Sequence, residues 1–174
     1  LDNPLGCFVY PLNPKRPAVH GFRCSPDIAS LPEAVDLVVI ATPAATVPDL
    51  IGECVKKGVP SAIIISAGFS ELGAEGRQLE ARIRQAASGK MRIIGPNCLG
   101  IIHPPSNLNA SFAALMPRPG HVTLLSQSGA ICTSILDWAR TKQFGFSSFV
   151  SVGAMLDVDF ADLIDYFVEE PNTR

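Results

Sequence analysis

Residues 121–142 read HVTLLSQSGAICTSILDWARTK and contain one complete strand–helix unit. An apolar run over 121–126 ends in the polar sequence Ser126-Gln127-Ser128-Gly129. A segment follows whose apolar residues have helical spacing: Ile131, Ile135, Leu136 and Trp138. The pattern predicts a buried β-strand that passes through a short turn into an α-helix over 129–142.

The same unit recurs along the chain. Short runs rich in Val and Ile, without polar alternation, are typical of parallel strands covered on both faces. The runs are residues 7–10, 36–41, 61–66, 91–95, 121–126 and 147–153, and helix-length segments lie at 43–57, 71–87, 129–142 and 157–168. This alternation predicts an α/β fold, a doubly wound parallel sheet with right-handed crossovers.

Two of the helical segments have predicted buried faces. In 71–87 the face contains Leu72, Leu79 and Ile83. The segment 157–168 is expected to begin at Asp157 as its cap and to bury Phe160, Leu163, Ile164 and Phe167. The sequence LMPRPG at 115–120 interrupts the pattern and predicts a boundary before a second, shorter α/β unit.

Composition excludes several classes of protein. Hydrophobic residues make up 47% of the chain and charged residues 17%, so it is not disordered. The net charge of −2 and the scattered Lys and Arg predict no nucleic-acid partner, and no apolar stretch is long enough to span a membrane. The five cysteines form no CxxC pair, which predicts no metal site and a reducing, cytoplasmic setting. Because residue 1 is Leu and no signal peptide follows, we expect part of a longer chain.

Three sets of loops follow predicted strands, where ligands collect in such sheets. Ser126, Gln127, Ser128 and Gly129 lie at a helix N-terminus, which suits a phosphate group, although Ser126 or Ser128 would also serve as a plain helix cap. Asn97 and Cys98 follow the strand at 91–95, where Cys98 is either close to a thiol ligand or a buried, inert thiol. The early loops contain Lys15 and Arg16, residues 41–45 and residues 66–70; Lys15 and Arg16 would meet phosphates or form a solvated turn.

Other titratable residues point to no chemistry. His20, His103 and His121 lack the spacing of a metal site or a catalytic triad and are interpreted as structural. The acidic residues between 157 and 165 are interpreted as caps and solvated positions rather than paired catalytic acids.

Taken in order, the motifs NPK, TPAAT, SAGFSE, GPNCLG, LLSQSGA, GFSSFVSVG and DLIDYF resemble those of the NDP-forming acyl-CoA synthetases. This family is similar to the α subunit of succinyl-CoA synthetase. The resemblance covers essentially the whole chain, and GPNCLG followed at this distance by SQSGA is its most specific part.

The resemblance implies a Rossmann-like CoA-binding domain over residues 1–117, followed by part of a flavodoxin-like ligase domain over 118–174. The implied reaction is acid + CoA + ATP to acyl-CoA + ADP + phosphate, by way of an acyl phosphate and a phosphohistidine. The implied cofactors are CoA and, on an ATP-grasp domain or subunit outside this chain, ATP/ADP with Mg. A small carboxylic acid as substrate and an oligomeric parent protein are further expectations.

The resemblance also implies roles for individual residues. The CoA-binding positions are Lys15, Thr42, Pro43, Ala44, Ala45, Ser66, Ala67, Gly68, Asn97 and Cys98. Ser126, Gln127, Ser128 and Gly129 match the helix N-terminus that receives the phosphohistidine, and they agree with the phosphate site expected from the residues themselves.

The chain departs from the family pattern at several points. The glycine-rich loop of the first domain would precede Leu1, and the phosphorylated histidine would lie beyond Arg174, so we expect these 174 residues alone to be inactive. Thr133 stands where the succinyl enzymes have a tyrosine, which favours a smaller acid such as acetate. Ala154 stands where related enzymes often have Asn.

Two other functions are weighed against the ligase. The same kind of region occurs in bacterial protein lysine acetyltransferases fused to a GNAT domain, where it would sense acyl-CoA. A nicotinamide-dependent oxidoreductase needs GxGxxG after its first strand and an acidic residue after its second. Residues 11–15, PLNPK, contain no acidic residue, which counts against that function.

Overall fold

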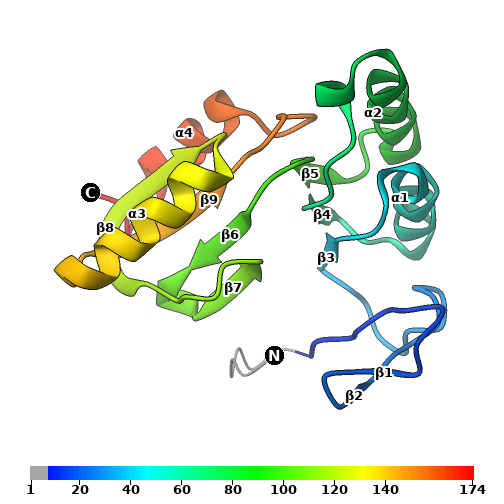
Figure 1. The fold of residues 1–174 in the computed structure, drawn as a ribbon, viewed down its shortest axis with the longest axis horizontal. Helices are drawn as coiled ribbons and strands as arrows, with labels where there is room; N and C mark the ends of the chain where they lie inside the picture. The colour runs from blue at the N-terminus through cyan, green and yellow to red at the C-terminus, as the bar shows by residue number, and fades with distance from the viewer. Residues whose placement is uncertain (1–7) are drawn as a thin grey trace.

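A computed structural model of the chain describes residues 8–174. Figure 1 shows two α/β units side by side, with α1 and α2 on the outer side of one sheet and α3 and α4 on the two sides of the other. The segment that begins at Phe8, drawn in blue, forms a small lobe below the first unit.

The first unit is built on a parallel sheet in the order β3-β4-β5. Its strands are β3 (Leu37–Ile40), β4 (Ser61–Ile64) and β5 (Arg92–Ile94), and its helices are α1 (Val47–Lys57) and α2 (Ala74–Ala87). The 3-10 turns η1 (Ala44–Thr46) and η2 (Ser70–Leu72) precede the two helices. Buried residues of both helices pack against one face of the sheet in a single cluster: Ile51 and Cys54 of α1, Ile83 of α2, and Ile64 and Ile93 of the strands.

The second unit has a mixed sheet in the order β7-β6-β9-β8. Its strands are β6 (Gly100–His103), β7 (Leu108–Ser111), β8 (Arg118–Ser126) and β9 (Gly145–Ser151), with a 3-10 turn η3 (Pro104–Ser106) between β6 and β7. β8 and β9 are parallel, and β6 is antiparallel to both β7 and β9. Helices α3 (Gly129–Lys142) and α4 (Phe160–Glu169) cover the sheet, and the adjacent residues Phe149 and Val150 of β9 belong to the clusters under α3 and α4 respectively.

The two units meet along one seam. The segment after β9 runs beside the segment after β5: Ala154 N donates to Pro96 O (2.9 Å), Leu156 N to Gly95 O (2.9 Å) and Val158 N to Ile93 O (3.1 Å). These bonds hold the loop after β5 against the second unit, so the carboxyl end of β5 faces that unit.

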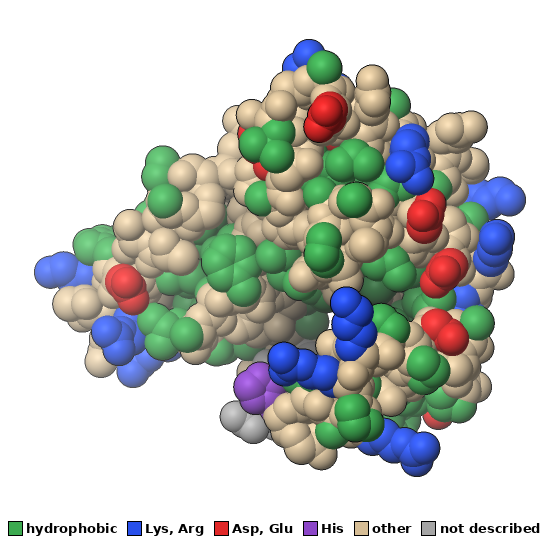
Figure 2. Space-filling view, turned by 45° about the vertical axis from the view of Figure 1, so that its right-hand side comes forward, with side chains coloured by type: hydrophobic (Ala, Val, Ile, Leu, Met, Phe, Trp, Pro, Cys, Tyr) green, Lys and Arg blue, Asp and Glu red, His purple; other side chains and the backbone are tan. Residues whose placement is uncertain are grey.

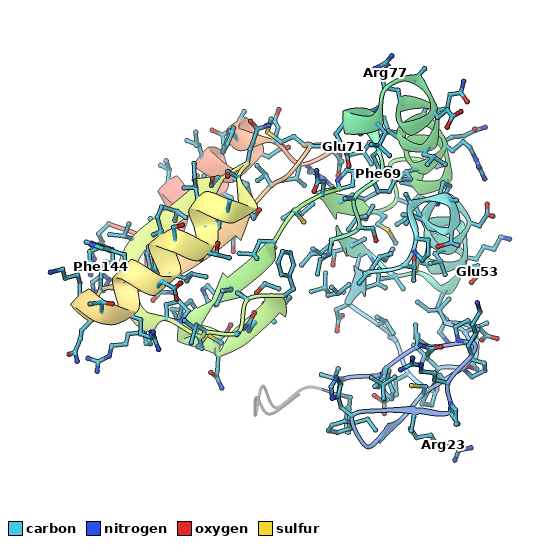
Figure 3. The ribbon with its side chains drawn as sticks, viewed as in Figure 1. Arg23, Glu53, Phe69, Glu71, Arg77 and Phe144 are labelled. Carbon is cyan, nitrogen blue, oxygen red and sulfur yellow. The ribbon has the colours of Figure 1, made fainter. Side chains whose placement is uncertain are left out.

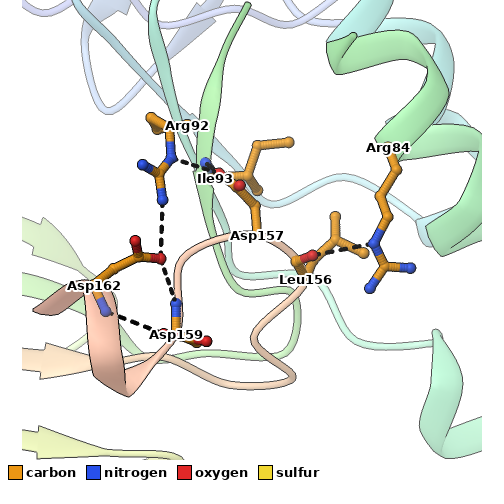
Figure 4. A network of polar contacts seen from close by, with 7 residues as sticks. All are labelled: Arg84, Arg92, Ile93, Leu156, Asp157, Asp159 and Asp162. Atoms are coloured by element: carbon orange, nitrogen blue, oxygen red, sulfur yellow. Dashed lines mark hydrogen bonds and ion pairs between the residues drawn. The ribbon is translucent and has the colours of Figure 1, made fainter. Parts of the chain in front are cut away.

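A network of polar side chains reinforces this seam (Figure 4). Asp157 Oδ2 accepts hydrogen bonds from Ile93 N (2.8 Å) and Arg92 Nε (3.0 Å), and Arg92 Nη2 reaches Asp162 Oδ2 at 3.0 Å. Arg84 Nε of α2 donates to Leu156 O at 3.1 Å. The prediction that Asp157 caps α4 is therefore wrong. Asp157 binds across the seam, and Asp159 caps α4 in a capping box with Asp162.

The predicted α/β fold is confirmed, with parallel strands at all five predicted positions from residue 36 onward. The predicted strand at 7–10 is wrong in its described part, because Phe8–Tyr10 form no strand and Phe8 is 77% exposed. A strand needs a neighbour that takes its backbone N–H and C=O groups, and no strand among residues 8–174 lies beside this segment. Cys7 lies outside the described residues.

Four short strands were not predicted. β1 (Ala18–Val19) and β2 (Phe22–Arg23) form a hairpin whose turn residues, His20 and Gly21, both have positive φ. β6 and β7 add an antiparallel arm to the second sheet. Two-residue strands and the Pro-interrupted segment between β6 and β7 have no periodic apolar pattern, so sequence reasoning passes over them.

The helices lie close to their predicted ranges, but some of the residues predicted to be buried are exposed. Leu163 is buried, whereas Ile164 is 53% exposed and Leu72 is 72% exposed. Among residues 8–174 no helix combines the length and the apolar character needed to cross a bilayer.

Candidate functional site

Hydrogen bonds join the loop after β3 to the loop after β4, and the loop after β4 to the loop after β5. Ser66 Oγ donates to Thr42 O at 2.5 Å, and Asn97 N donates to Ser66 O at 2.9 Å. Thr42, Ser66 and Asn97 were predicted from three separate motifs, and the structure brings them together. The parallel register places all three loops at one edge of the sheet.

Small residues line this edge where the first two loops approach each other. A Cβ built on Gly68 would lie 3.1 Å from Ala44 Cβ, and Gly68 has φ +109, which a side chain would strain. Pro43, Ala45 and Ala67 are exposed beside them. The edge is therefore open to a ligand that lies flat on the backbone, as the predicted CoA-binding positions require.

The amide of Gly68 is already engaged. Its N–H donates to Glu71 Oε1 at 2.6 Å, and Figure 3 shows Glu71 next to Phe69 on this loop. Desolvation raises the pKa of Glu71, but hydrogen bonds from the backbone N–H groups of Gly68, Glu71 and Phe69 outweigh it, so its pKa is lowered. A ligand contact through this amide requires displacement of the Glu71 carboxylate.

A cavity of about 490 Å³ lies where the two units meet. It is bounded on one side by the loop after β5 and on the other by the first turn of α3. Its walls are Ile65, Ala67, Asn97, Cys98, Leu99, Phe112, Gly129, Ala130 and Thr133. The cavity therefore joins the predicted thiol end of the CoA site to the predicted phosphate site.

Asn97 and Cys98 play different parts in the wall of this cavity. Asn97 has φ +55 and is exposed, and no described residue hydrogen bonds to its side-chain amide, which remains available to a ligand. Cys98 is buried, its thiol donates to Ile64 O at 3.3 Å, and burial raises its pKa to about 12. Because thiolate is the reactive form, Cys98 is a wall of the cavity and not a nucleophile.

The N-terminus of α3 faces the cavity from the second unit. Ser128 caps the helix by accepting from Ile131 N at 3.2 Å, and Ser126 Oγ accepts from Ser128 N at 3.1 Å. A Cβ built on Gly129 would meet nothing within 4 Å. Within the described part of the chain, the N–H groups of Gly129 and Ala130 have no acceptor, as expected for the first turn of a helix. They are free to bind an anion.

The other predicted residue of this turn, Gln127, has a structural contact. Its Nε2 donates to Gly153 O at 3.3 Å, which ties the turn after β8 to the loop after β9. The loop after β9 continues into the seam through Ala154 N and Pro96 O. The phosphate-side turn and the thiol-side loop are thus positioned by one continuous set of backbone contacts.

Lys15 lies apart from this group of residues. It is exposed in a turn that is closed by Asn13 Oδ1, which accepts from Lys15 N at 2.9 Å and from Arg16 N at 3.1 Å. In the face drawn in Figure 2, Lys and Arg side chains border a hollow in the lower half of the molecule. No contact recorded among the described residues joins Lys15 to the loops after β3, β4 and β5.

None of the histidines lines the cavity. His103 Nδ1 lies 2.7 Å from Ser106 Oγ, His121 Nδ1 lies 3.3 Å from Asn172 O, and His20 occupies the β1–β2 turn. Among residues 8–174 no group of three or more potential ligand side chains could hold a metal ion.

Sequence reasoning missed Ile65, Leu99, Phe112 and Ala130 as walls of the cavity. Ile65 and Leu99 adjoin predicted site residues, and Ala130 follows Gly129, so proximity to the motifs could have indicated them. Phe112 had no such signal, because it follows the unpredicted strand β7 and reaches the cavity only through the fold of the antiparallel arm.

Comparisons with known proteins identify the family of the chain. A model of the CoA-binding domain family matches residues 3–104, and a model of the succinyl-CoA ligase-like flavodoxin domain matches residues 119–174. An ADP-forming acetate–CoA ligase of Methanocaldococcus jannaschii is 44% identical over 95% of this chain and 23% of its own length. The α subunit of ADP-forming acetate–CoA ligase I of Pyrococcus furiosus is 39% identical over 95% of this chain and 37% of its own.

A solved structure is similar as well. Dinucleotide-forming acetyl-coenzyme A synthetase 1 of Candidatus Korarchaeum cryptofilum, in complex with phosphate and ADP, matches with a TM-score of 0.87 and 38% identity over 94% of this chain and 35% of that chain. The chain thus spans between about a quarter and somewhat over a third of the length of these relatives. None of the three is described as an acetyltransferase, so the acyl-CoA sensor considered above gains no support.

The paired loops at the strand ends, the cavity against α3 and the match over residues 3–104 lead to one conclusion: this chain belongs to the CoA-binding domain family, in the group found in ADP-forming acyl-CoA ligases.

Proposed function

We propose that this chain is the CoA-binding part of an ADP-forming acyl-CoA ligase whose substrate is a small carboxylic acid such as acetate. The whole enzyme converts acid, CoA and ATP to acyl-CoA, ADP and phosphate. The observation that carries the proposal is the cavity that joins Asn97 and Cys98 to the open N-terminus of α3. Acyl transfer to a thiol requires those two positions to adjoin, because the acyl phosphate has to lie between them.

By this assignment the chain divides near residues 117 and 118 into a Rossmann-like domain and part of a flavodoxin-like ligase domain. The antiparallel arm β6–β7 lies before that boundary in the sequence but pairs with the sheet of the second unit. Lys15, residues 42–45 and residues 66–68 would hold CoA, with Asn97 and Cys98 beside its thiol. CoA supplies that thiol as the acyl acceptor when it is bound. The small, exposed residues along the sheet edge fit such a ligand, whereas the engaged amide of Gly68 does not offer a free donor.

Phosphoryl transfer is assigned to the α3 end of the cavity. The free N–H groups of Gly129 and Ala130, together with the helix dipole, would stabilise negative charge on a phosphoryl group. Other parts of the enzyme would supply the histidine that becomes phosphorylated. They would also supply the ATP-grasp domain or subunit, which holds ATP/ADP and Mg. We therefore expect residues 1–174 alone to be inactive. We also propose that the whole enzyme is oligomeric and cytoplasmic.

The first test uses the full-length protein and ATP labelled at the γ-phosphate. The ligase forms an acid-labile protein phosphate, and CoA with acetate discharges it. The absence of label together with tight binding of acetyl-CoA would contradict the ligase and favour a sensor of acyl-CoA.

Two substitutions then separate the two ends of the site. Lys15→Ala should weaken CoA binding while leaving phosphorylation intact, and unchanged affinity would remove Lys15 from the site. Gly129→Val should block phosphoryl transfer by covering the helix N-terminus while leaving CoA affinity unchanged. Gly52→Ala is the matched control, because a Cβ at Gly52 in α1 meets nothing within 4 Å and lies outside the site.

A further inference from the structure

The cavity between the two units has one aromatic wall, Phe112, which the proposed function does not yet use. Phe112 is 62% exposed, although it is a large apolar residue. It belongs to no hydrophobic cluster and no aromatic pair among residues 8–174. Its ring therefore contributes little to the core, and its recorded environment is the cavity.

The backbone under this ring is held firmly. Phe112 N donates to Leu99 O at 3.2 Å, Ala113 N donates to Ser111 Oγ at 3.1 Å, and Asn109 Nδ2 donates to Ala113 O at 3.2 Å. These bonds close the turn after β7 on both sides of Phe112. A wall built on such a turn keeps its position when a ligand presses against it.

A close approach between strands adds to this rigidity. Gly100, at the start of β6, has φ +111, and a Cβ there would lie 2.3 Å from Ala110 O. β6 and β7 are thus in backbone contact just before the turn that carries Phe112, which limits how far the backbone beneath the ring can shift.

The rest of the cavity is uncharged, and it is apolar apart from the side-chain amide of Asn97, the hydroxyl of Thr133 and the backbone at the start of α3. Ile65, Leu99 and Ala130 contribute aliphatic walls, and no Asp, Glu, Lys or Arg among residues 8–174 lines it. The hydroxyl of Thr133 is turned back to its own helix, where it donates to Ala130 O at 2.9 Å. Such a cavity favours an apolar acyl chain, because a charged chain would be desolvated there without a partner.

We propose that Phe112 sets the size of the acyl group, as a fixed wall that admits a short apolar chain and excludes branched or aromatic ones. This inference rests on the proposed ligase function and deepens it by naming the residue that selects the acid. Removing the ring enlarges the cavity without introducing a charge. The kcat/KM for larger monocarboxylic acids should therefore rise, whereas the kcat/KM for acetate should not.

The test compares Phe112→Ala, Phe112→Leu and the wild type in the full-length enzyme. The kcat/KM ratio of phenylacetate to acetate should rise at least about tenfold in Phe112→Ala and less in Phe112→Leu, since burying even one extra methylene changes selectivity by about 10- to 200-fold. The Kd for CoA should stay the same. Tyr166→Ala is the matched control, because Tyr166 on α4 is 65% exposed and does not line the cavity.

A ratio within about twofold of the wild type in Phe112→Ala would overturn the inference while leaving the ligase function in place. If the wild type forms no acyl-CoA from any acid, the proposed ligase function is wrong. The role of Phe112 is then tested by the affinity of the protein for acyl-CoA thioesters. Phe112→Ala should then bind phenylacetyl-CoA at least about tenfold more tightly with acetyl-CoA unchanged. Equal affinities of the variant and the wild type for both thioesters would overturn it.

Discussion

Gly153 and Pro96 are in backbone contact across the seam: a Cβ at residue 153 would lie 2.1 Å from Pro96 O and 2.6 Å from Asn97 O. Gly153 also has φ +56, a conformation that glycine adopts without strain. Because Asn97 belongs to the cavity wall, this contact connects the packing of the two units directly to the geometry of the site.

Replacing Gly153 should therefore be costly. Gly153→Ala adds strain at positive φ and a clash with backbone atoms that cannot rotate away, and we expect a loss of about 2 to 4 kcal/mol in the free energy of unfolding. Urea unfolding followed by circular dichroism measures it. Gly52→Ala, inside α1 with open space around its Cβ, should instead stabilise by about 0.5 to 1 kcal/mol. Equal effects of the two substitutions would contradict the contact.

The acceptor role of Asp157 can be separated from its charge. Asp157→Asn retains an oxygen for Ile93 N but loses the ion pair with Arg92, which is largely exposed and worth about 0 to 1 kcal/mol. Asp157→Ala removes the acceptor as well and should cost about 1 to 2 kcal/mol. When unfolding is repeated in 1 M salt, the part of the loss in free energy of unfolding that comes from the ion pair should shrink, and the part that comes from the hydrogen bond to Ile93 N should not. A larger loss for Asn than for Ala would contradict this division.

The carboxylate of Glu71 should make stability depend on pH. Its folded pKa lies below the ordinary value of 4.5, so its stabilisation is fully present above 4.5 and is lost as the pH falls through the folded pKa. The difference in the free energy of unfolding between wild type and Glu71→Gln should therefore be larger at pH 6 than at pH 3. Asp137→Asn, a change at an exposed position on α3, controls for general charge effects. A difference that does not vary with pH would show that the Gly68 amide is not held by a charged carboxylate.

The cysteines should differ sharply in reactivity. In a Cys7→Ser background four cysteines remain, of which Cys54, Cys98 and Cys132 are buried and Cys24 is partly exposed. Burial raises the pKa of Cys54 to about 11 and of Cys98 to about 12, so at pH 8 neither presents appreciable thiolate. A thiol reagent should label one cysteine quickly in the folded protein and four after unfolding. Rapid modification of Cys98 in the folded protein would contradict the burial of its thiol.

Much of the fold is predictable because its signals are local. The segment 129–142 is a helix over the full predicted range, since Ser128 is a strong cap and the residues after it have helical periodicity. The parallel strands are recognisable as unbroken apolar runs. Phe8–Tyr10 show the limit of this reasoning: an apolar run becomes a strand only where a neighbouring strand accepts its hydrogen bonds.

The candidate site is predictable in its parts but not in its assembly. Thr42, Ser66, Asn97 and Gly129 can be singled out because turns at strand ends and helix N-termini have recognisable residues. That Asn97 and Gly129 line one cavity depends on the seam at Gly153 and Pro96, whose contacts join residues more than 50 positions apart.

Sequence patterns therefore account for the class of fold, the positions of the loops and the family of CoA-binding domains, because each depends on short-range periodicity or on contiguous motifs. The exposed ring of Phe112 at the cavity, the engagement of the Gly68 amide by Glu71 and the use of Asp157 as a clamp rather than a cap depend on how distant segments pack. Packing follows from volume, backbone clearance and unpaired hydrogen-bonding groups in three dimensions, and none of these is encoded in the spacing of residues along the chain.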